Sequence, residues 1–252
     1  LIEPSFPDWL IADPCVLLPE NTPNGLWHLF ANAILQGIQH FTSTDGVKWE
    51  RVGKKVFGGI RPYVYNEGDT FHIFYESALG WHGSGIYRRR STDLFHWSEA
   101  DLVLAPHYDW EGGFVRTNGN PCLVKHEGRY RLYFSAGVIF LRDCLFFEPR
   151  YIGVAESESL DGVFEKRAEP LIGPAPEPFF RNFGAGSMKV ITPEEAGDGA
   201  WWAFNNGIYH DAEGRSRSEI RLLKSKDGYE WRLVSEEPLL APTDEGWKRA
   251  LV

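Results

Sequence analysis

The chain has 252 residues, of which 43% are hydrophobic, 24% charged and 15% aromatic. This apolar content can bury one large core, so we expect a single globular domain. With 26 basic and 35 acidic residues the net charge is −9, which repels a phosphate backbone and excludes nucleic acid as a partner. The longest apolar stretches, such as residues 135–141, fall far short of the roughly 20 residues of a membrane helix, so we expect no membrane contact.

The three cysteines, Cys15, Cys122 and Cys144, show neither a CxxC pair nor zinc-ligand spacing. They indicate no disulfide scaffold and no cysteine-bound metal, and they favour a reducing, cytoplasmic compartment. The chain starts with Leu1 rather than Met and shows no signal peptide there, so we expect that an upstream segment is missing.

A turn of the pattern Ser-x-Asp-Gly-x-x-Trp recurs four times along the chain. Its copies, or variants of it, stand at residues 43–49, 91–97, 157–164 and 225–231. A strand-like run rich in aromatic and β-branched residues precedes each copy, at 26–32, 71–76, 130–135 and 201–206. A third recurring element lies further upstream and begins at Ala12, Ile60, Gly119 and Gly186. Such regular self-similarity is typical of a repeat architecture.

Each repeat predicts four antiparallel strands, the composition of a propeller blade. We therefore predict an all-β fold, a five-bladed β-propeller with blades at approximately 10–55, 56–105, 114–172 and 181–242 and a partial fifth from 246. A complete fifth blade would need roughly 50 more residues, so we expect it to be incomplete in this chain. The alternative is a four-bladed propeller in which the last strand closes the ring.

Polar positions at one edge of the predicted blades form the candidate site. In an antiparallel sheet the start of the first strand and the end of the second lie at the same edge. The first-strand positions are Asp13, Arg61, Asn120, Ser187 and, in the partial fifth unit, Arg249; the second-strand ends are Asn32, Glu76, Ser135 and Asn206. Because inner strands ring the central channel of a propeller, we expect these side chains to converge on one mouth of it.

The connections between second and third strands are long, aromatic and charged, at residues 77–85, 136–150 and 207–218. They open at the same edge, and four of their residues are placed either to wall a cleft or to pack the loops onto the blades: Trp81, His82, Tyr209 and His210. Aromatic faces combined with amides and guanidinium groups suit a sugar ligand.

Glycoside cleavage usually takes two carboxylates. Asp13 is the first candidate, with capping of the strand turn as its structural alternative. Glu76 is the second, because desolvation at the end of an apolar strand would favour the protonated form that a general acid needs. An ion pair with Arg61 is the alternative for Glu76. Reserve candidates in the loops are Glu111, Asp143 and Glu148.

The early Asp-Pro, the repeated aromatic strands and the Ser-x-Asp-Gly-x-x-Trp turns resemble the five-bladed propeller glycosidases over essentially the whole chain. These are glycoside hydrolase family 43 and its relatives in families 32, 68, 117 and 130. The resemblance implies that Asp13 is the general base. A second inner-strand aspartate and a later glutamate acid complete the family 43 pattern, but Arg61, Asn120 and Ser187 stand at the corresponding positions. The acid is then Glu76, or it comes from the missing blade or a partner, or the propeller binds sugars without cutting them.

We therefore predict a glycoside hydrolase or related glycosyl-transferring enzyme that acts on an oligosaccharide by single displacement with inversion. A noncatalytic carbohydrate-binding propeller is the alternative, and a structural propeller without a small ligand is the third possibility. Arg61 and Arg249 suit an anionic group on the substrate, such as a uronate or a phosphate. Some relatives hold a central Ca²⁺, but no ligand cluster for it stands in this sequence, so we expect no cofactor and no metal.

Overall fold

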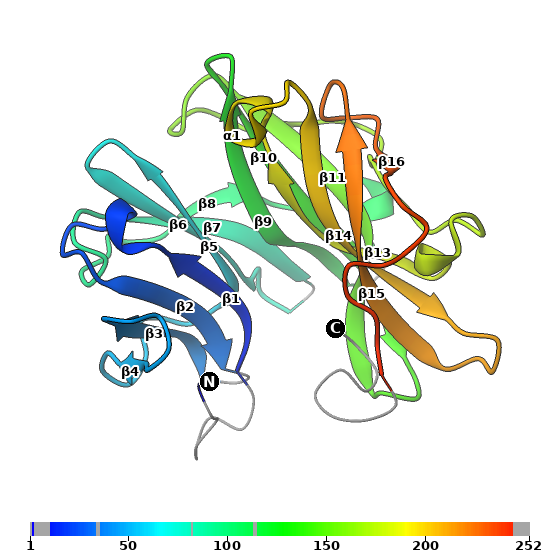
Figure 1. Ribbon diagram of the computed structural model, residues 1–252, viewed down its shortest axis with the longest axis horizontal. Helices are drawn as coiled ribbons and strands as arrows, with labels where there is room; N and C mark the ends of the chain where they lie inside the picture. The colour runs from blue at the N-terminus through cyan, green and yellow to red at the C-terminus, as the bar shows by residue number, and fades with distance from the viewer. Residues whose placement is uncertain (1, 3–10, 34–35, 82, 113–114, 244–252) are drawn as a thin grey trace. The chain divides into compact units, whose positions relative to one another are not determined.

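The computed structural model describes residues 2, 11–33, 36–81, 83–112 and 115–243 (Figure 1). Strands dominate, and the predicted all-β class is confirmed. Within these residues the helical segments are one α-helix, α1 (Pro193–Ala196), and three 3-10 turns, η1 (Pro19–Asn21), η2 (Asp109–Glu111) and η3 (Phe179–Arg181). The predicted partial blade from residue 246 lies outside the described residues.

The strands follow one another in four ladders of four; the first and fourth ladders are separate four-stranded sheets, and the second and third share one eight-stranded sheet. The first contains β1 (Ile11–Leu17), β2 (Trp27–Ala33), β3 (Gly37–Ser43) and β4 (Glu50–Arg51). The second contains β5 (Ile60–Glu67), β6 (Thr70–Ala78), β7 (Gly83–Ser91) and β8 (Asp101–Leu104). The third contains β9 (Arg116–His126), β10 (Arg129–Leu141), β11 (Phe146–Ser157) and β12 (Glu165–Lys166), and the fourth contains β13 (Gly184–Ile191), β14 (Trp201–His210), β15 (Ser216–Ser225) and β16 (Arg232–Leu233).

The chain divides into two compact units. Unit 1 comprises Leu1–Ala105 together with Gly119–Pro121 and holds the first two ladders. Unit 2 comprises Pro106–Asn118 together with Cys122–Val252 and holds β10–β12 and the fourth ladder. The predicted blade boundaries, the single domain and the count of five blades stay predictions.

The recurring turn connects the third and fourth strands of each ladder. In the first copy the hydroxyl of Ser43 accepts the backbone N–H of Gly46 (2.9 Å), and the carboxylate of Asp45 accepts those of Val47 and Lys48 (2.9 and 2.8 Å). The fourth residue adopts a left-handed φ, 71° at Gly46 and 69° at Leu94. These side chains satisfy backbone donors of the turn, which is why Ser and Asp recur there.

The second strands of the first two ladders are buried along most of their length. Both faces of β2 and β6 are covered along nearly their whole length, which explains their continuous apolar runs. One core cluster of unit 1 joins the two ladders through Phe30, Ile38, Val64 and Ile73. In unit 2, the guanidinium of Arg131 lies 4.7 Å from the ring centre of Trp201 and 4.3 Å from that of Tyr229, and so links β10 to the fourth ladder.

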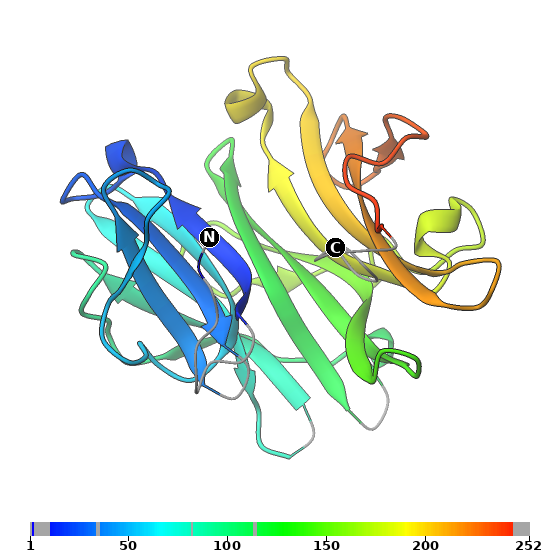
Figure 2. The same ribbon diagram turned by 60° about the horizontal axis from the view of Figure 1, so that its bottom comes forward.

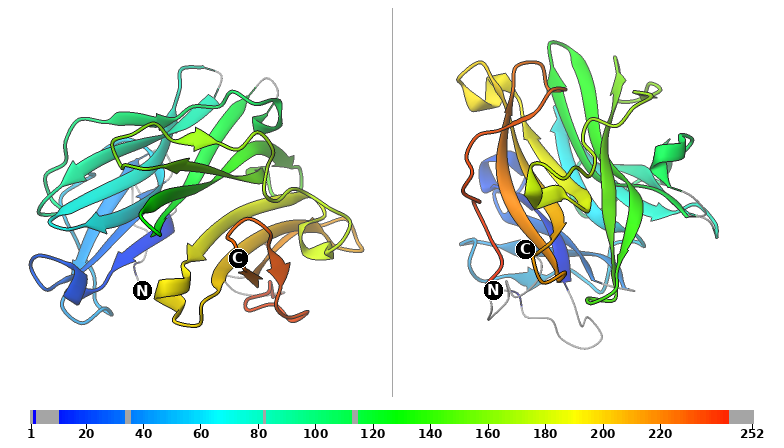
Figure 3. Two further views of the ribbon diagram at one scale, coloured as in Figure 1. Left: turned by 90° about the horizontal axis from the view of Figure 1, so that it is seen from above. Right: turned by 90° about the vertical axis from the view of Figure 1, so that its right-hand side faces the viewer.

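Two predicted loops are hairpins in the structure. Residues 136–150 continue β10 to Leu141 and start β11 at Phe146, and Figure 2 shows these strands as the long green hairpin. Residues 207–218 likewise extend β14 to His210 and begin β15 at Ser216, and the yellow-to-orange strands of this ladder run side by side in both views of Figure 3. The aromatic and β-branched residues of these segments favour strand, so the prediction of long loops was wrong here.

Candidate functional site

The first strands of unit 1 carry a β-bulge at the predicted site positions. Asp13 and Pro14 lie between the pairs Ala12↔Asn32 and Cys15↔Phe30, where two residues of β1 oppose one of β2. The same irregularity separates Ile60↔Glu76 from Tyr63↔Phe74 and contains Arg61 and Pro62. Bulges interrupt the ladder and redirect the side chain of the extra residue.

The bulge residues are held in an unfavourable backbone conformation. Asp13, Arg61 and Asn120 have φ values of 53°, 56° and 47°, and each precedes a proline. Left-handed backbone is costly for residues other than glycine, and a following proline restricts the backbone further. Strain repeated at one position of three successive repeats points to a functional site.

Glu76 is buried and binds Arg61. Its Oε2 accepts a hydrogen bond from Arg61 Nη1 at 2.8 Å, and its Oε1 accepts one from Ser84 Oγ at 2.6 Å. The side chains are 7% exposed for Glu76 and 19% for Arg61. The ion pair is therefore the alternative that the structure supports, and it fixes the guanidinium of Arg61 in place.

Two further contacts hold this part of unit 1 together. Asn32 Oδ1 accepts the backbone N–H of Arg61 at 2.8 Å. Gly119 lies directly against the carboxylate of Glu76, where a Cβ atom would overlap Oε2. Only glycine leaves room for Glu76 at this point, immediately before Asn120. Asn120 is 8% exposed, and its side-chain amide forms no hydrogen bond within the described part of the chain.

Asp13 differs from Glu76 in its surroundings. It is exposed, and among the described residues it forms no hydrogen bond and no ion pair. Its carboxylate is therefore available to a ligand or to a water molecule. Unit 1 thus offers one available carboxylate, one fixed guanidinium and two amides on bulges and strand ends, the polar groups that hydroxyl-rich ligands require.

A cavity of about 440 Å³ lies beside Glu76. The side chain of Lys55 at its wall is exposed and forms no ion pair with the described residues. Four glycines leave much of the wall as bare backbone. The lining residues are Gln36, Gly37, Lys55, Gly58, Gly59, Ile60, Glu76, Ser77, Ala78, Gly83 and Ser84.

In unit 2 the left-handed position is Gly186 (φ 61°), one residue before the candidate residue Ser187. Ser187 pairs with Asn206 in the regular ladder, and the bulge contains Ala185 and Gly186. No proline follows this bulge, and it requires glycine because the Cβ of any other residue at position 186 would overlap the carbonyl oxygen of Asn206. Ser135 Oγ donates to the carbonyl oxygen of Gly186 at 2.8 Å.

The aromatic candidates separate in the structure. Trp81 is 96% exposed on the β6–β7 hairpin and lines neither cavity described in this section. Tyr209 packs on Phe179 with ring centres 5.3 Å apart, and His210 packs on Phe183 at 4.1 Å. His82 and Arg249 lie outside the described residues.

The reserve carboxylates have structural partners. Glu111 is fully buried and accepts hydrogen bonds from Lys166, Asn118 and two backbone N–H groups. Burial alone would raise the pKa of Glu111, but these donors lower it below its ordinary value. Asp143 binds Ser216, and Glu148 lies in β11. Within the described residues, no group of three or more histidine, cysteine, aspartate and glutamate side chains could hold a metal ion.

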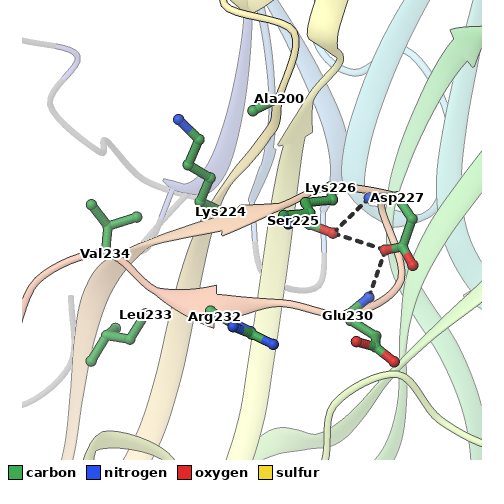
Figure 4. A pocket seen from close by; sticks show the side chains of 9 residues that line it. All are labelled: Ala200, Lys224, Ser225, Lys226, Asp227, Glu230, Arg232, Leu233 and Val234. Carbon is green, nitrogen blue, oxygen red and sulfur yellow. Dashed lines mark hydrogen bonds between the residues drawn. The ribbon is translucent and has the colours of Figure 1, made fainter.

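A larger cavity, about 590 Å³, lies at the β15–β16 turn of unit 2 (Figure 4). The carboxylate of Asp227 accepts from Ser225 Oγ and from the backbone N–H of Glu230, both at 3.0 Å, so it belongs to the recurring turn. The charged ends of Lys224 and Glu230 point away from each other in Figure 4. The polar groups of this cavity do not converge.

No helix in the described parts of the chain has the length and apolar composition to cross a membrane.

Ser84 and Gly119 are the site residues that the sequence did not reveal. Both contact Glu76 from other strands. Ser84 stands outside the recurring motifs, and Gly119 begins one copy of a recurring element that does not itself indicate this contact. The small residue before Asn120 was the one available signal for the close approach of another side chain.

No family model matches the chain. Two uncharacterised proteins of Mycobacterium tuberculosis, from the strains CDC 1551 / Oshkosh and ATCC 25618 / H37Rv, are 35% and 34% identical to it over 82 residues. Each match covers 30% of this chain and 26% of the relative. The chain thus matches about a quarter of the length of these curated relatives.

Solved structures resemble the chain over almost its whole length. An endo-1,4-beta-xylanase from Bacteroides thetaiotaomicron VPI-5482 has a TM-score of 0.70 at 19% identity, covering 99% of this chain and 80% of its own. An N-acetylgalactosamine deacetylase from F. plautii, in complex with blood group B trisaccharide, has 0.68 at 16%, covering 100% and 76%. A thermostable family-43 glycoside hydrolase has 0.52 at 20%, covering 94% and 96%. The chain therefore has the fold of the propeller-type glycoside hydrolases, as the resemblance of its sequence predicted.

Proposed function

We propose that the protein acts on glycosides at the polar edge of unit 1 that contains Asp13, Arg61, Glu76 and Asn120. The observation that carries this proposal is the difference between the two carboxylates. Asp13 is exposed on a strained bulge and has no partner among the described residues, whereas Glu76 is buried against Arg61 and Ser84. Asp13 is thus the group suited to take a proton from an attacking water molecule.

Glu76 acts as a positioning residue in this proposal. Both of its oxygens accept hydrogen bonds, so a proton for the leaving group would have to displace Arg61 or Ser84. The substrate is an oligosaccharide, and Arg61 and Asn120 bind its hydroxyl groups or an anionic substituent. In the proposed step a water molecule attacks the anomeric carbon directly, with inversion, while Asp13 takes the proton of that water. The bond to the leaving oxygen breaks, and solvent water supplies the proton to this oxygen because Glu76 is engaged.

Aryl glycosides with activated leaving groups test Asp13 alone, because they need little help from an acid. We expect Asp13→Asn to lower kcat by roughly 10²- to 10⁴-fold, since an amide cannot accept the proton of water. Folding should be intact, because Asp13 is exposed. Asp69→Asn, at another exposed aspartate of unit 1, is the matched control. Retention of the full rate by the Asp13 variant would refute the assignment.

Noncatalytic carbohydrate binding is the second candidate, and the hydrogen bonds that engage Glu76 favour it. This function predicts that the protein binds glycans on an array but releases no sugar from any aryl glycoside or oligosaccharide of the panel. Turnover that Asp13→Asn abolishes would rule it out. The five-blade architecture is also part of the proposal, and an experimental structure of the chain would count the blades.

A further inference from the structure

We infer that unit 2 carries a second carbohydrate-binding site, in the cavity at the ends of the β10–β11 and β14–β15 hairpins. The class of its ligand rests on the proposed function. The cavity measures about 550 Å³, which is large enough for one or two sugar rings. None of its lining residues belongs to the polar edge of unit 1 described above. They all lie in unit 2 and are Phe140, Arg142, Asp143, Phe183, His210 and Gly214.

The two hairpins that form the cavity are tied together. Asp143, in the β10–β11 turn, accepts the backbone N–H of Ser216 at 2.7 Å and its hydroxyl at 2.5 Å. The hydrogen bond from the Ser216 side chain lowers the pKa of Asp143, so this link persists at neutral pH. Asn182 Oδ1 accepts the backbone N–H of His210 at 3.0 Å. A cavity held by such links exists before a ligand arrives, which reduces the entropic cost of binding.

Aromatic side chains supply the apolar surface of the cavity. The ring of Phe183 packs on that of His210 and rests against the buried cluster of Ile139, Leu141 and Ile208. Phe140 is 44% exposed, and its ring centre lies 4.9 Å from that of Phe147. The exposed part of the Phe140 ring offers a flat apolar face, on which the C–H face of a sugar ring can stack.

Polar groups lie beside these rings. Arg142 is exposed and forms no hydrogen bond or ion pair with the described residues, so its five N–H donors are available to hydroxyl groups. Gly214 has no atom within 4 Å of the position of a Cβ, which leaves the mouth open. The positive charge of Arg142 stands beside the negative charge of Asp143. The cavity is therefore better suited to a neutral saccharide than to an anionic one.

The experiment compares binding to an array of neutral and acidic oligosaccharides, followed by calorimetric titration with each bound neutral glycan. Phe140→Ala and Arg142→Ala remove the stacking face and the donors from exposed positions. Phe204→Ala and Arg129→Ala are matched controls at exposed positions of unit 2 outside the cavity. We expect at least one neutral glycan to bind about tenfold more weakly to both cavity variants and equally well to both controls.

Unchanged affinities in both cavity variants would overturn the inference, and so would binding of acidic glycans alone or of no glycan at all. The same experiments distinguish failure of this second site from failure of the proposed function. If Asp13→Asn abolishes turnover while the cavity variants bind every glycan normally, the catalytic proposal stands and the second site does not exist. If the wild type turns over no glycoside while the cavity variants lose glycan affinity, the second site stands without the catalytic proposal.

Discussion

The side-chain oxygen of Asn32 accepts the backbone N–H of Arg61 at 2.8 Å, so the end of β2 holds the bulge that begins β5. Unit 2 has a related contact, in which the hydroxyl of Ser135 in β10 donates to the carbonyl oxygen of Gly186 in β13. Each bond joins the second strand of one ladder to the first strand of the next. The positions that sequence repetition marks as candidate ligand contacts therefore also connect neighbouring ladders.

The Arg61–Glu76 pair should contribute measurably to stability. We expect Glu76→Gln to lower the free energy of unfolding by about 2 to 4 kcal/mol, because it removes the negative charge that pairs with the largely buried guanidinium of Arg61. Urea unfolding of the two single variants and the double variant with Arg61→Ala measures the coupling directly. The pair should show a coupling energy of about 1 to 3 kcal/mol. Additive single effects would contradict the proposed dependence of Arg61 on Glu76.

Two left-handed glycines provide a matched comparison of steric overlap. A Cβ at Gly186 (φ 61°) would overlap the carbonyl oxygen of Asn206, whereas one at Gly197 (φ 72°) would meet no atom within 4 Å. Gly197→Ala should cost about 1 kcal/mol for its backbone conformation alone. Gly186→Ala should cost about 2 to 4 kcal/mol, because the bulge must also move. Equal losses of stability in urea would show that the bulge is not tightly packed.

Two cysteines accept hydrogen bonds from the backbone of the following ladder. Cys15 Sγ binds the N–H of Val64, and Cys122 Sγ binds that of Val190, both at 3.3 Å. Cys122 is 1% exposed, so Cys122→Ala should destabilise the protein by about 1 to 3 kcal/mol by leaving the N–H without an acceptor. Cys15→Ala should cost less, since water reaches this half-buried position. Thermal unfolding of the two variants tests the order, and the reverse order would contradict it.

A buried pair of histidines should make the protein sensitive to acid. His28 Nδ1 lies 2.8 Å from His40 Nε2, and burial lowers the pKa of His28 to about 4 and that of His40 to about 3. In the unfolded chain both titrate near their ordinary value of 6.5. At a pH between the folded-state and unfolded-state pKa values, the unfolded chain binds more protons than the folded protein. The free energy of unfolding therefore falls as the pH drops below about 6.5.

Urea unfolding from pH 7 to pH 4 measures this loss, which we expect to reach at least about 3 kcal/mol. Replacing one exposed histidine, His96→Asn, should preserve most of the slope, because its side chain is 90% exposed. His40→Phe should reduce the slope. A slope that His40→Phe leaves unchanged would mean that the pair does not control the acid response.

The repeats were visible in the sequence because their turn uses side chains for backbone hydrogen bonds. Ser43, Asp45 and their counterparts recur for that reason, and they determine where each ladder ends. Leu94 shows the limit of such a pattern. It occupies the left-handed position where other copies have glycine, and its full burial offsets a conformation that its residue type disfavours.

Repetition in the sequence marked candidate positions for the site but did not reveal their contacts. Asp13, Arg61 and Asn120 stand out because a proline follows each of them. In the fourth repeat Met188 replaces that proline, and the left-handed residue is Gly186, one position before the candidate Ser187. The partners of Glu76 come from separate strands, so only tertiary packing reveals Ser84 and Gly119. The hairpin extensions were missed because their glycines and charged residues also suit loops.

The bulges of β1 and β5 separate the choice of a side chain from the pairing of the strands. Because the extra residue lies outside the regular ladder, its chemical group can change while the register on either side stays the same. The left-handed position carries an acid at Asp13, a base at Arg61 and an amide at Asn120. Asn120→Asp would therefore supply unit 1 with a carboxylate at a third such position, and new chemistry could be engineered there without redesigning the fold.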